Sequence, residues 1–201
     1  MKKISLSVIC FSITLLSFYT YFKTTKIYLP KPFGYVHIDL PHHEYVDLPN
    51  NWPFSFQISK YAKIEIPKDY EKDWLNIVYP NLDSKFVATI QLTYKYVNGN
   101  KKLLRSLLND SYKLGMKHNV KAYSIDQEII KTSQNKKIAL FTIRGEVPTT
   151  FQFYTMDCDD HFIRGALYFK TALANDYLEP IINYIKTDII HLLSTLEYKN
   201  K

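Results

Sequence analysis

Residues 137–170 read KIALFTIRGEVPTTFQFYTMDCDDHFIRGALYFK, and this stretch decides the fold. Apolar and polar residues alternate along three runs, at 137–147, 150–157 and 161–170, which is the period-two pattern of β-strands. The acidic segment 157–160 is short enough to join the last two runs as a hairpin. The stretch therefore predicts consecutive antiparallel strands.

The rest of the chain extends this pattern on both sides. Runs rich in β-branched and aromatic residues precede the stretch, at 54–58, 62–66, 74–79, 86–97 and 121–129. Two segments instead carry the three- and four-residue apolar spacing of amphipathic helices, at 101–117 and 177–197, and Pro180 is expected in the first turn of the second. We predict an α+β fold in which both helices pack on a face of an antiparallel sheet.

The N-terminus has the features of a signal sequence. Lys2 and Lys3 precede an uncharged apolar run at 4–22, which is close to the length of about 20 residues that spans a bilayer. No small residues stand at the end of the run where a cleavage site requires them, so residues 1–22 are predicted to be an uncleaved transmembrane anchor. Lysines flank the run on both sides, and the charges therefore do not fix its orientation.

Prolines mark the division between the anchor and the folded part. Residues 23–53 contain five prolines, and we predict a stalk there with a first edge strand at 33–40. Residues 54–201 are predicted to form a single globular domain.

Composition argues against several functional classes. The net charge is +7, but five lysines lie beside the apolar run, so we expect no nucleic-acid partner. The two cysteines, Cys10 and Cys158, form no disulfide framework, and Cys158 is expected to be a small buried apolar residue. No nucleophile elbow, phosphate-binding loop or zinc motif is present, and we expect neither enzymatic activity nor a cofactor.

Two clusters of titratable residues are candidates for a metal site or a catalytic site. His42, His43 and Glu44 lie near two aspartates, but prolines around them prevent the helix that would align metal ligands, and a solvated loop without a metal is predicted. The second cluster combines the acidic segment 157–160 with His161 and Arg164. On a strand these last two residues point to opposite faces, which disfavours a joint catalytic site. Arg164 is left with two possible roles, an ion pair with Glu146 or a nearby aspartate, and contact with a partner.

Several segments taken together resemble a known family. They are LPKPFGY at 29–35, IDLP at 38–41, TIQLTYK at 89–95, DSYKL at 110–114 and above all HFIRGALYF at 161–169. In this order they are similar to the gliding-motility lipoprotein GldD family of Bacteroidetes. The resemblance implies a cell-envelope protein needed for surface gliding and for the associated type IX secretion machinery, acting with other envelope proteins and without catalytic residues.

The resemblance also bears on the anchor. Family members usually carry a lipid-modified cysteine shortly before the Pro-x-Pro segment, where this chain has LLSFY at 15–19. We therefore expect no lipid attachment, and an inner-membrane anchor with the domain in the periplasm.

From these observations we predict a non-enzymatic interaction component of the envelope. Its candidate partner-binding residues lie at the edge 33–40 and along the strand 161–169, and they are Asp39, His161, Arg164 and Tyr168. Two alternatives stay open. The first is an envelope hydrolase with His161 acting beside Asp157 or Asp160, and the second is a carrier of lipid or peptidoglycan fragments.

Overall fold

The computed structural model describes residues 6–24, 38–49, 52–67, 73–83, 86–132, 136–157, 160–169 and 178–199. The chain divides into two units, residues 1–34 and residues 35–201. The first contains helix α1 (Leu6–Thr24). Within the described ranges no helix combines the length and the apolar character needed to cross a membrane, so the predicted transmembrane anchor is not confirmed.

The second unit contains strands at each run predicted between 54 and 169 and both predicted helices, together with short elements at 45–47, 117–120 and 197–198 that were not predicted. In chain order they are β1 (Tyr45–Asp47), β2 (Phe54–Ser55), β3 (Gln57–Ser59), β4 (Lys63–Glu65), β5 (Trp74–Asp83), β6 (Phe86–Tyr96), α2 (Lys101–Met116), the 3₁₀ turn η1 (Lys117–Val120), β7 (Ala122–Lys131), β8 (Lys137–Gly145), β9 (Thr149–Asp157), β10 (His161–Phe169), α3 (Glu179–Thr195) and β11 (Glu197–Tyr198). Pro180 lies in the first turn of α3, as predicted.

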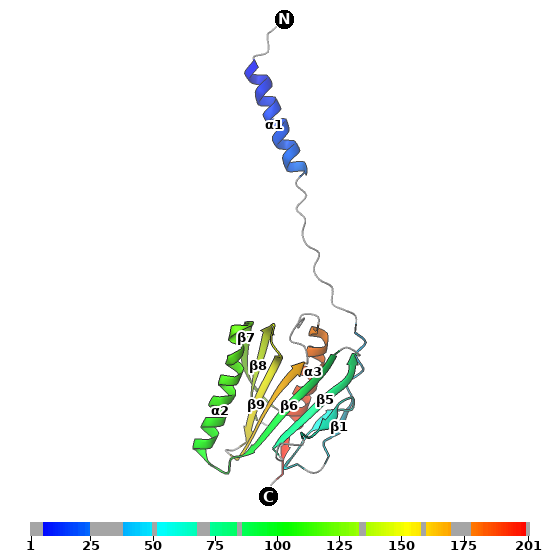
Figure 1. The fold of residues 1–201 in the computed structure, drawn as a ribbon, viewed down its shortest axis with the longest axis vertical. Helices are drawn as coiled ribbons and strands as arrows, with labels where there is room; N and C mark the ends of the chain where they lie inside the picture. The colour runs from blue at the N-terminus through cyan, green and yellow to red at the C-terminus, as the bar shows by residue number, and fades with distance from the viewer. Residues whose placement is uncertain are drawn as a thin grey trace. The chain divides into compact units, whose positions relative to one another are not determined.

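Seven strands form one antiparallel sheet in the order β4-β5-β6-β10-β9-β8-β7 (Figure 1). After β6 the chain passes through α2 to the far edge of the sheet, and the hairpins β7–β8–β9–β10 then return to its middle. There β10 pairs with β6 along its whole length, from His161 opposite Tyr96 to Phe169 opposite Ala88. The stretch 137–170 therefore closes the sheet by joining its two halves.

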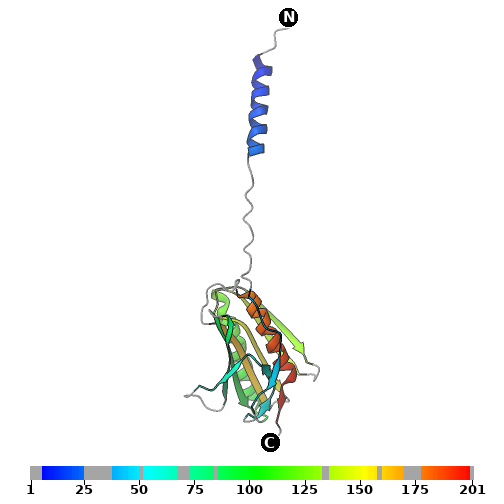
Figure 2. The same ribbon diagram turned by 90° about the vertical axis from the view of Figure 1, so that its right-hand side faces the viewer.

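The two helices lie on opposite faces of the sheet, which corrects the prediction that both pack on one face (Figures 1 and 2). On one face α3 packs against Ile163 and Leu167 of β10, and on the other Leu104 of α2 packs against Phe162. Alternate residues of a strand point to opposite faces, and β10 buries apolar residues of both sets. These buried residues need cover on both sides, and α3 supplies it on one face and α2 on part of the other.

A glycine allows the closest packing beneath α3. Gly165 in β10 lies opposite Phe153 of β9, and a Cβ atom on Gly165 would lie 2.2 Å from the Phe153 ring. The ring is completely buried. Because Gly165 has no side chain, the Phe153 ring can pack directly over the backbone of β10.

Two short sheets attach the ends of this unit to the core. β1 pairs with β3, and the C-terminal β11 pairs with β2. The edge strand predicted at 33–40 falls partly outside the described residues, and its described part, 38–40, forms no strand. A turn at Val97–Asn100 joins β6 to α2, with positive φ at Asn98 and Gly99.

Candidate functional site

One half of the sheet face that carries α2 has no helix over it among the described residues (Figure 1). Cross-strand neighbours form three rows there, from β5 through β6 to β10. We call this surface the open face, and its residues are Trp74, Thr93 and Arg164 in the first row, Asn76, Gln91 and Ala166 in the second, and Val78, Thr89 and Tyr168 in the third. Most of these side chains are partly exposed, which is the burial expected of a sheet surface facing solvent.

Arg164 lies at the β10 end of the first row of the open face and is partly buried. Its Nη2 donates a hydrogen bond of 2.9 Å to Oε1 of Gln152 on β9, and Tyr168 provides a second polar contact four residues along the same strand. Of the two roles left open for Arg164, the ion pair with Glu146 or an aspartate does not occur among the described residues, where the partners of Arg164 are an amide and a hydroxyl. Burial lowers the pKa of Arg164 from its usual value, yet a guanidinium stays protonated in proteins. Arg164 therefore brings a positive charge to the open face and pairs with no carboxylate among the described residues.

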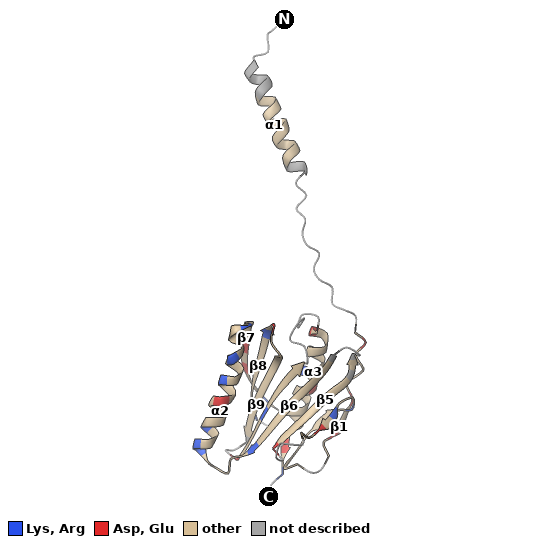
Figure 3. Cartoon of the chain, viewed as in Figure 1, with Lys and Arg blue, Asp and Glu red and all other residues tan. Residues whose placement is uncertain are grey.

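Arg164 also lowers the pKa of a histidine that follows α2. His118 lies in η1, and its pKa is lowered first by partial burial and then by the positive charges of Arg164 and Lys117. Both effects disfavour the imidazolium. Charged residues are otherwise few on the strands of the open face, in contrast to the lysines and arginine along α2 (Figure 3).

His161 points to the other face of the sheet from Arg164, as predicted. Its Nδ1 lies 2.9 Å from the hydroxyl of Tyr94, and its ring stacks on Tyr198 at 4.6 Å between centroids. These contacts place tyrosines around His161. The side chain of Asp157, which the hydrolase alternative paired with His161, lies outside the described residues.

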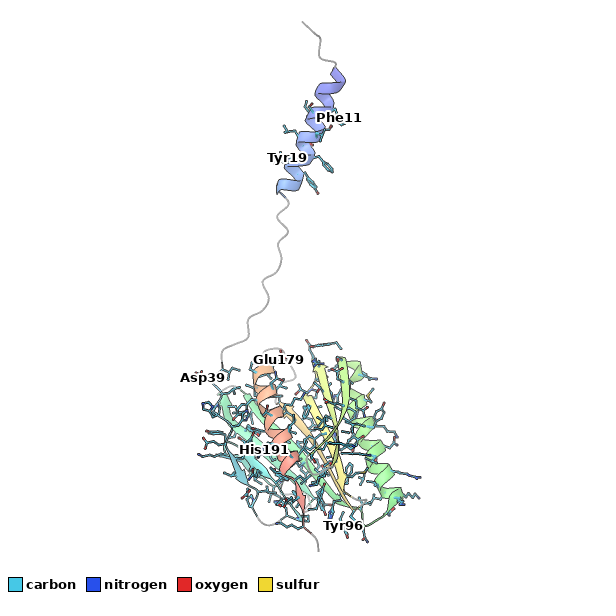
Figure 4. All side chains as sticks on the ribbon, turned by 180° about the vertical axis from the view of Figure 1, so that it is seen from behind. Phe11, Tyr19, Asp39, Tyr96, Glu179 and His191 are labelled. Atoms are coloured by element: carbon cyan, nitrogen blue, oxygen red, sulfur yellow. The ribbon has the colours of Figure 1, made fainter. Side chains whose placement is uncertain are left out.

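Asp39 is exposed in the segment that precedes β1. Figure 4 shows it at the opposite end of the domain from Tyr96, the residue that lies opposite His161 in the sheet. Of the four candidates, the structure therefore brings together only Arg164 and Tyr168.

A buried group of polar residues was missed by the sequence analysis. Asp188 of α3 is only 3% exposed, and its two carboxylate oxygens bind two different residues. Nδ1 of His43 lies 2.6 Å from Oδ1, and the Tyr79 hydroxyl donates a hydrogen bond of 3.0 Å to Oδ2. We call these residues, together with Tyr45 and Tyr184 around them, the Asp188 cluster.

Aromatic stacking completes this cluster. The ring of His43 stacks on Tyr184 at 4.3 Å, and Tyr45 stacks on His191 of α3 at 3.6 Å. Burial and the charge of Asp188 raise the pKa of both Tyr45 and Tyr184 to about 12, and they raise that of Tyr79 as well. The three phenols are therefore neutral at physiological pH. The cluster holds the segment before β2 against α3.

The prediction of a solvated loop at residues 42–44 is correct, because all three residues are exposed and lie in neither a helix nor a strand, but it did not foresee the contact of His43. Glu44 is exposed and pairs with Lys60, whereas His43 is docked on the buried Asp188. The one sequence signal for this contact is an aspartate inside the apolar stripe of α3, three residues after Ile185. Among the described residues no group of three histidine, cysteine or acidic side chains is placed to hold a metal ion.

Comparison with known proteins gives a family and a distant structural likeness. No curated protein matches the chain. The solution structure of cyanobacterial PsbP (CyanoP) from Synechocystis sp. PCC 6803 matches 83% of this chain and 99% of its own, with a TM-score of 0.48 and 8% sequence identity. A family model described as gliding motility lipoprotein GldD matches residues 25–198, which is most of the chain and includes every strand of the sheet. The chain therefore belongs to the gliding motility lipoprotein GldD family.

Proposed function

We propose that the domain is a non-enzymatic interaction component of the cell envelope that supports gliding motility and the associated type IX secretion machinery. Membership of the family places the protein in the membrane-associated envelope. The observation that supports an interaction role is the open face, which combines a tryptophan, a tyrosine and an arginine without a covering helix.

These three residue types are those that contribute most to binding at protein interfaces. Trp74 and Tyr168 offer aromatic surface on either side of the polar middle row, and Arg164 offers donors without a carboxylate partner among the described residues. A partner protein that places an acidic side chain at Arg164 and apolar side chains beside the two aromatic rings matches this arrangement. Arginine binds carboxylates through paired hydrogen bonds, which would fix the orientation of such a partner.

We also propose that the N-terminal segment holds the protein at the inner membrane with the domain in the periplasm. The sequence supports this with two lysines before an uncharged apolar run and with the absence of a small-residue cleavage site. Membrane fractionation with intact-mass measurement tests it. Full-length, unmodified protein in the inner-membrane fraction is expected, whereas a shortened or acylated chain contradicts it.

The interaction role is tested by recovering crosslinked envelope proteins from cells that carry Arg164→Ala or Tyr168→Ala. Both variants are expected to lose most of the recovered partner and to reduce colony spreading and secretion, because each removes contact groups from the open face. Folding should be nearly unchanged, since Arg164 forms no ion pair with any described residue and Tyr168 is only partly buried. Thermal unfolding of the purified variants checks this point.

Arg105→Ala provides the matched control. Arg105 lies on the exposed side of α2, outside the open face, and its replacement removes the same charge and side-chain length. It should leave partner recovery unchanged. Full recovery with both open-face variants, or equal losses with Arg105→Ala, would contradict the assignment of the interface to the open face.

A further inference from the structure

Behind the surface of the open face, Arg164 is held by a side chain that is itself buried. Nη2 of Arg164 donates a hydrogen bond of 2.9 Å to Oε1 of Gln152, which is only 2% exposed. Gln152 lies on β9, where it continues the second row of the open face next to Ala166 of β10. A partner protein on the open face therefore does not contact Gln152, and any effect of Gln152 on that partner passes through Arg164.

The surroundings of Gln152 are those of an apolar core. Its neighbours in the row are Ala166 on one side and Phe141 of β8 on the other, and they are 0% and 1% exposed. The Oε1 atom of Gln152 accepts from Arg164, whereas its Nε2 is buried and has no hydrogen-bond partner among the described residues. A buried donor without an acceptor lowers stability, so stability alone does not explain an amide at this position.

The chemistry of the two side chains gives a different reason for the amide. A guanidinium has N–H donors and no acceptor, so Gln152 must present its oxygen to Arg164. The amide oxygen fixes the direction of the guanidinium but carries no charge. A glutamate here would fix the guanidinium and also neutralise it, and an apolar residue would do neither. Of these three choices, only glutamine combines a fixed guanidinium with an uncompensated positive charge.

We propose that Gln152 is the positioning residue of the open face, because it holds the guanidinium of Arg164 in place and leaves the positive charge to a carboxylate of the partner protein. A side chain that is already ordered loses less conformational freedom on binding. An ordered arginine can then pair with a carboxylate through paired hydrogen bonds. This role of Gln152 rests on the proposed interaction role of the open face, and it adds the residue that orients Arg164 without neutralising it.

Two substitutions of nearly equal side-chain length separate orientation from charge, and NMR of the full chain in mild detergent measures both. Gln152→Met removes the acceptor and leaves the charge, so rotation of the Arg164 guanidinium should become faster while the pKa of His118 stays the same. Gln152→Glu keeps an acceptor and adds a carboxylate, which stays ionised beside an arginine. The rotation should then stay slow, and the pKa of His118, which burial and then Arg164 lower, should rise toward its usual value.

Both variants should also recover less of the crosslinked partner, in the same cells and assay as Arg164→Ala. We expect a loss of about three- to tenfold for Gln152→Met, because the guanidinium must then be ordered on binding. The loss for Gln152→Glu should be about tenfold or more, because the charged hydrogen bonds to the partner are replaced by an internal pair. The Tm of Gln152→Met should stay the same or rise, since the lost Nε2 has no partner among the described residues.

Gln127 provides the matched control. It lies on β7 in the same row, opposite Phe141, and it is exposed. Gln127→Met and Gln127→Glu make the same chemical changes two strands away from Gln152, at a distance of about 10 Å. They should alter neither the rotation of the guanidinium, nor the pKa of His118, nor the recovery of the partner.

Several results would overturn the role of Gln152. Unchanged guanidinium rotation in Gln152→Met, or an unchanged pKa of His118 in Gln152→Glu, would do so without reference to any partner. Full partner recovery in both Gln152 variants would also do so when Arg164→Ala loses the partner. Full recovery in Arg164→Ala has a different meaning, because it would contradict the open face as the interface. Each Gln152 variant has its own NMR readout, so a variant that fails to fold leaves the other as the test.

Discussion

The two faces of the sheet differ in how completely they are covered. The face beneath α3 forms the large core, in which even the polar Asp188 has its oxygens satisfied by His43 and Tyr79. The face beneath α2 has two small clusters of buried apolar residues, and the rest of it is the open face. There Arg164 has no carboxylate partner among the described residues. On the covered face Asp188 is thus enclosed and both its oxygens are paired, whereas on the open face Arg164 is only partly buried.

This difference indicates which residues stabilise the fold and which are available for binding. Removing one member of an enclosed polar group leaves the others without partners, so the effect falls on stability. Removing a partly exposed group costs little stability, because water replaces its contacts, and the effect falls on binding. The four predictions below test this division, beginning with the largest expected effect.

The largest effect is expected from Asp188→Ala. The substitution leaves the buried Tyr79 hydroxyl without its acceptor and removes the partner of His43, and it should cost about 3 kcal/mol, because hydrogen bonds to a charged group contribute about 1.5–3 kcal/mol. Urea unfolding of the variant should therefore show a much lower midpoint, and limited proteolysis should cut the segment before β2 more quickly.

Asp126→Ala is the control for this experiment. Asp126 pairs with Arg144 at the sheet edge, where both side chains are more than half exposed, and such a pair contributes at most about 1 kcal/mol. A cost for Asp188→Ala no larger than that of the control would mean that the Asp188 cluster does not hold the covered face together.

The second prediction concerns packing on the same covered face. Gly165→Ala introduces a Cβ atom into the space of the Phe153 ring and should cost about 1–3 kcal/mol through overpacking. Phe153→Leu alone should also destabilise the fold, because it removes part of a buried ring. In the double variant the new methyl group finds room, so the combined cost should be smaller than the sum. Strictly additive unfolding free energies would contradict this close contact.

The sequence predicted the strands well because their signal is local. The alternation along 161–169 identifies β10, and the spacing of leucines and isoleucines identifies α2 and α3. The helix faces were predicted wrongly because β10 buries apolar residues on both sides, and such a pattern does not indicate which helix covers which side. The position of α2 depends instead on the crossover from β6 to β7, which is a property of the whole topology.

The candidate site was predicted only in part for a related reason. Arg164 and Tyr168 are four residues apart on one strand, so their shared face follows from strand geometry. The contact between His43 and Asp188 joins residues 145 positions apart, and no local pattern encodes it. Asp188 interrupts an apolar helix stripe, which indicates a buried polar contact but does not identify its partner.

The third prediction concerns α2, which covers only part of its face. Oδ1 of Asn100 accepts a hydrogen bond of 3.0 Å from the backbone N–H of Leu103 and so caps the start of the helix. Asn100→Ala should cost about 1 kcal/mol, whereas Asn100→Asp should retain most of the stability. Urea unfolding measures both. If Asn100→Ala lowered the free energy of unfolding as much as Asp188→Ala, the two faces would depend equally on their helices. This result would contradict the difference between the covered face and the open face.

The smallest effect is expected at His118, which reports the charge on the open face. Its pKa in the folded protein is lowered by burial and then by Arg164, so between that pKa and the unfolded value of about 6.5 the unfolded chain binds more protons. Its contribution to stability is therefore complete above about pH 6.5 and is lost as the pH falls toward the folded pKa. In Arg164→Ala the imidazole pKa, followed by NMR, should rise toward 6.5 without reaching it, because burial remains. Arg105→Ala should leave it unchanged, and an unchanged pKa in Arg164→Ala would show that the guanidinium charge is neutralised on the open face and is not available to a partner.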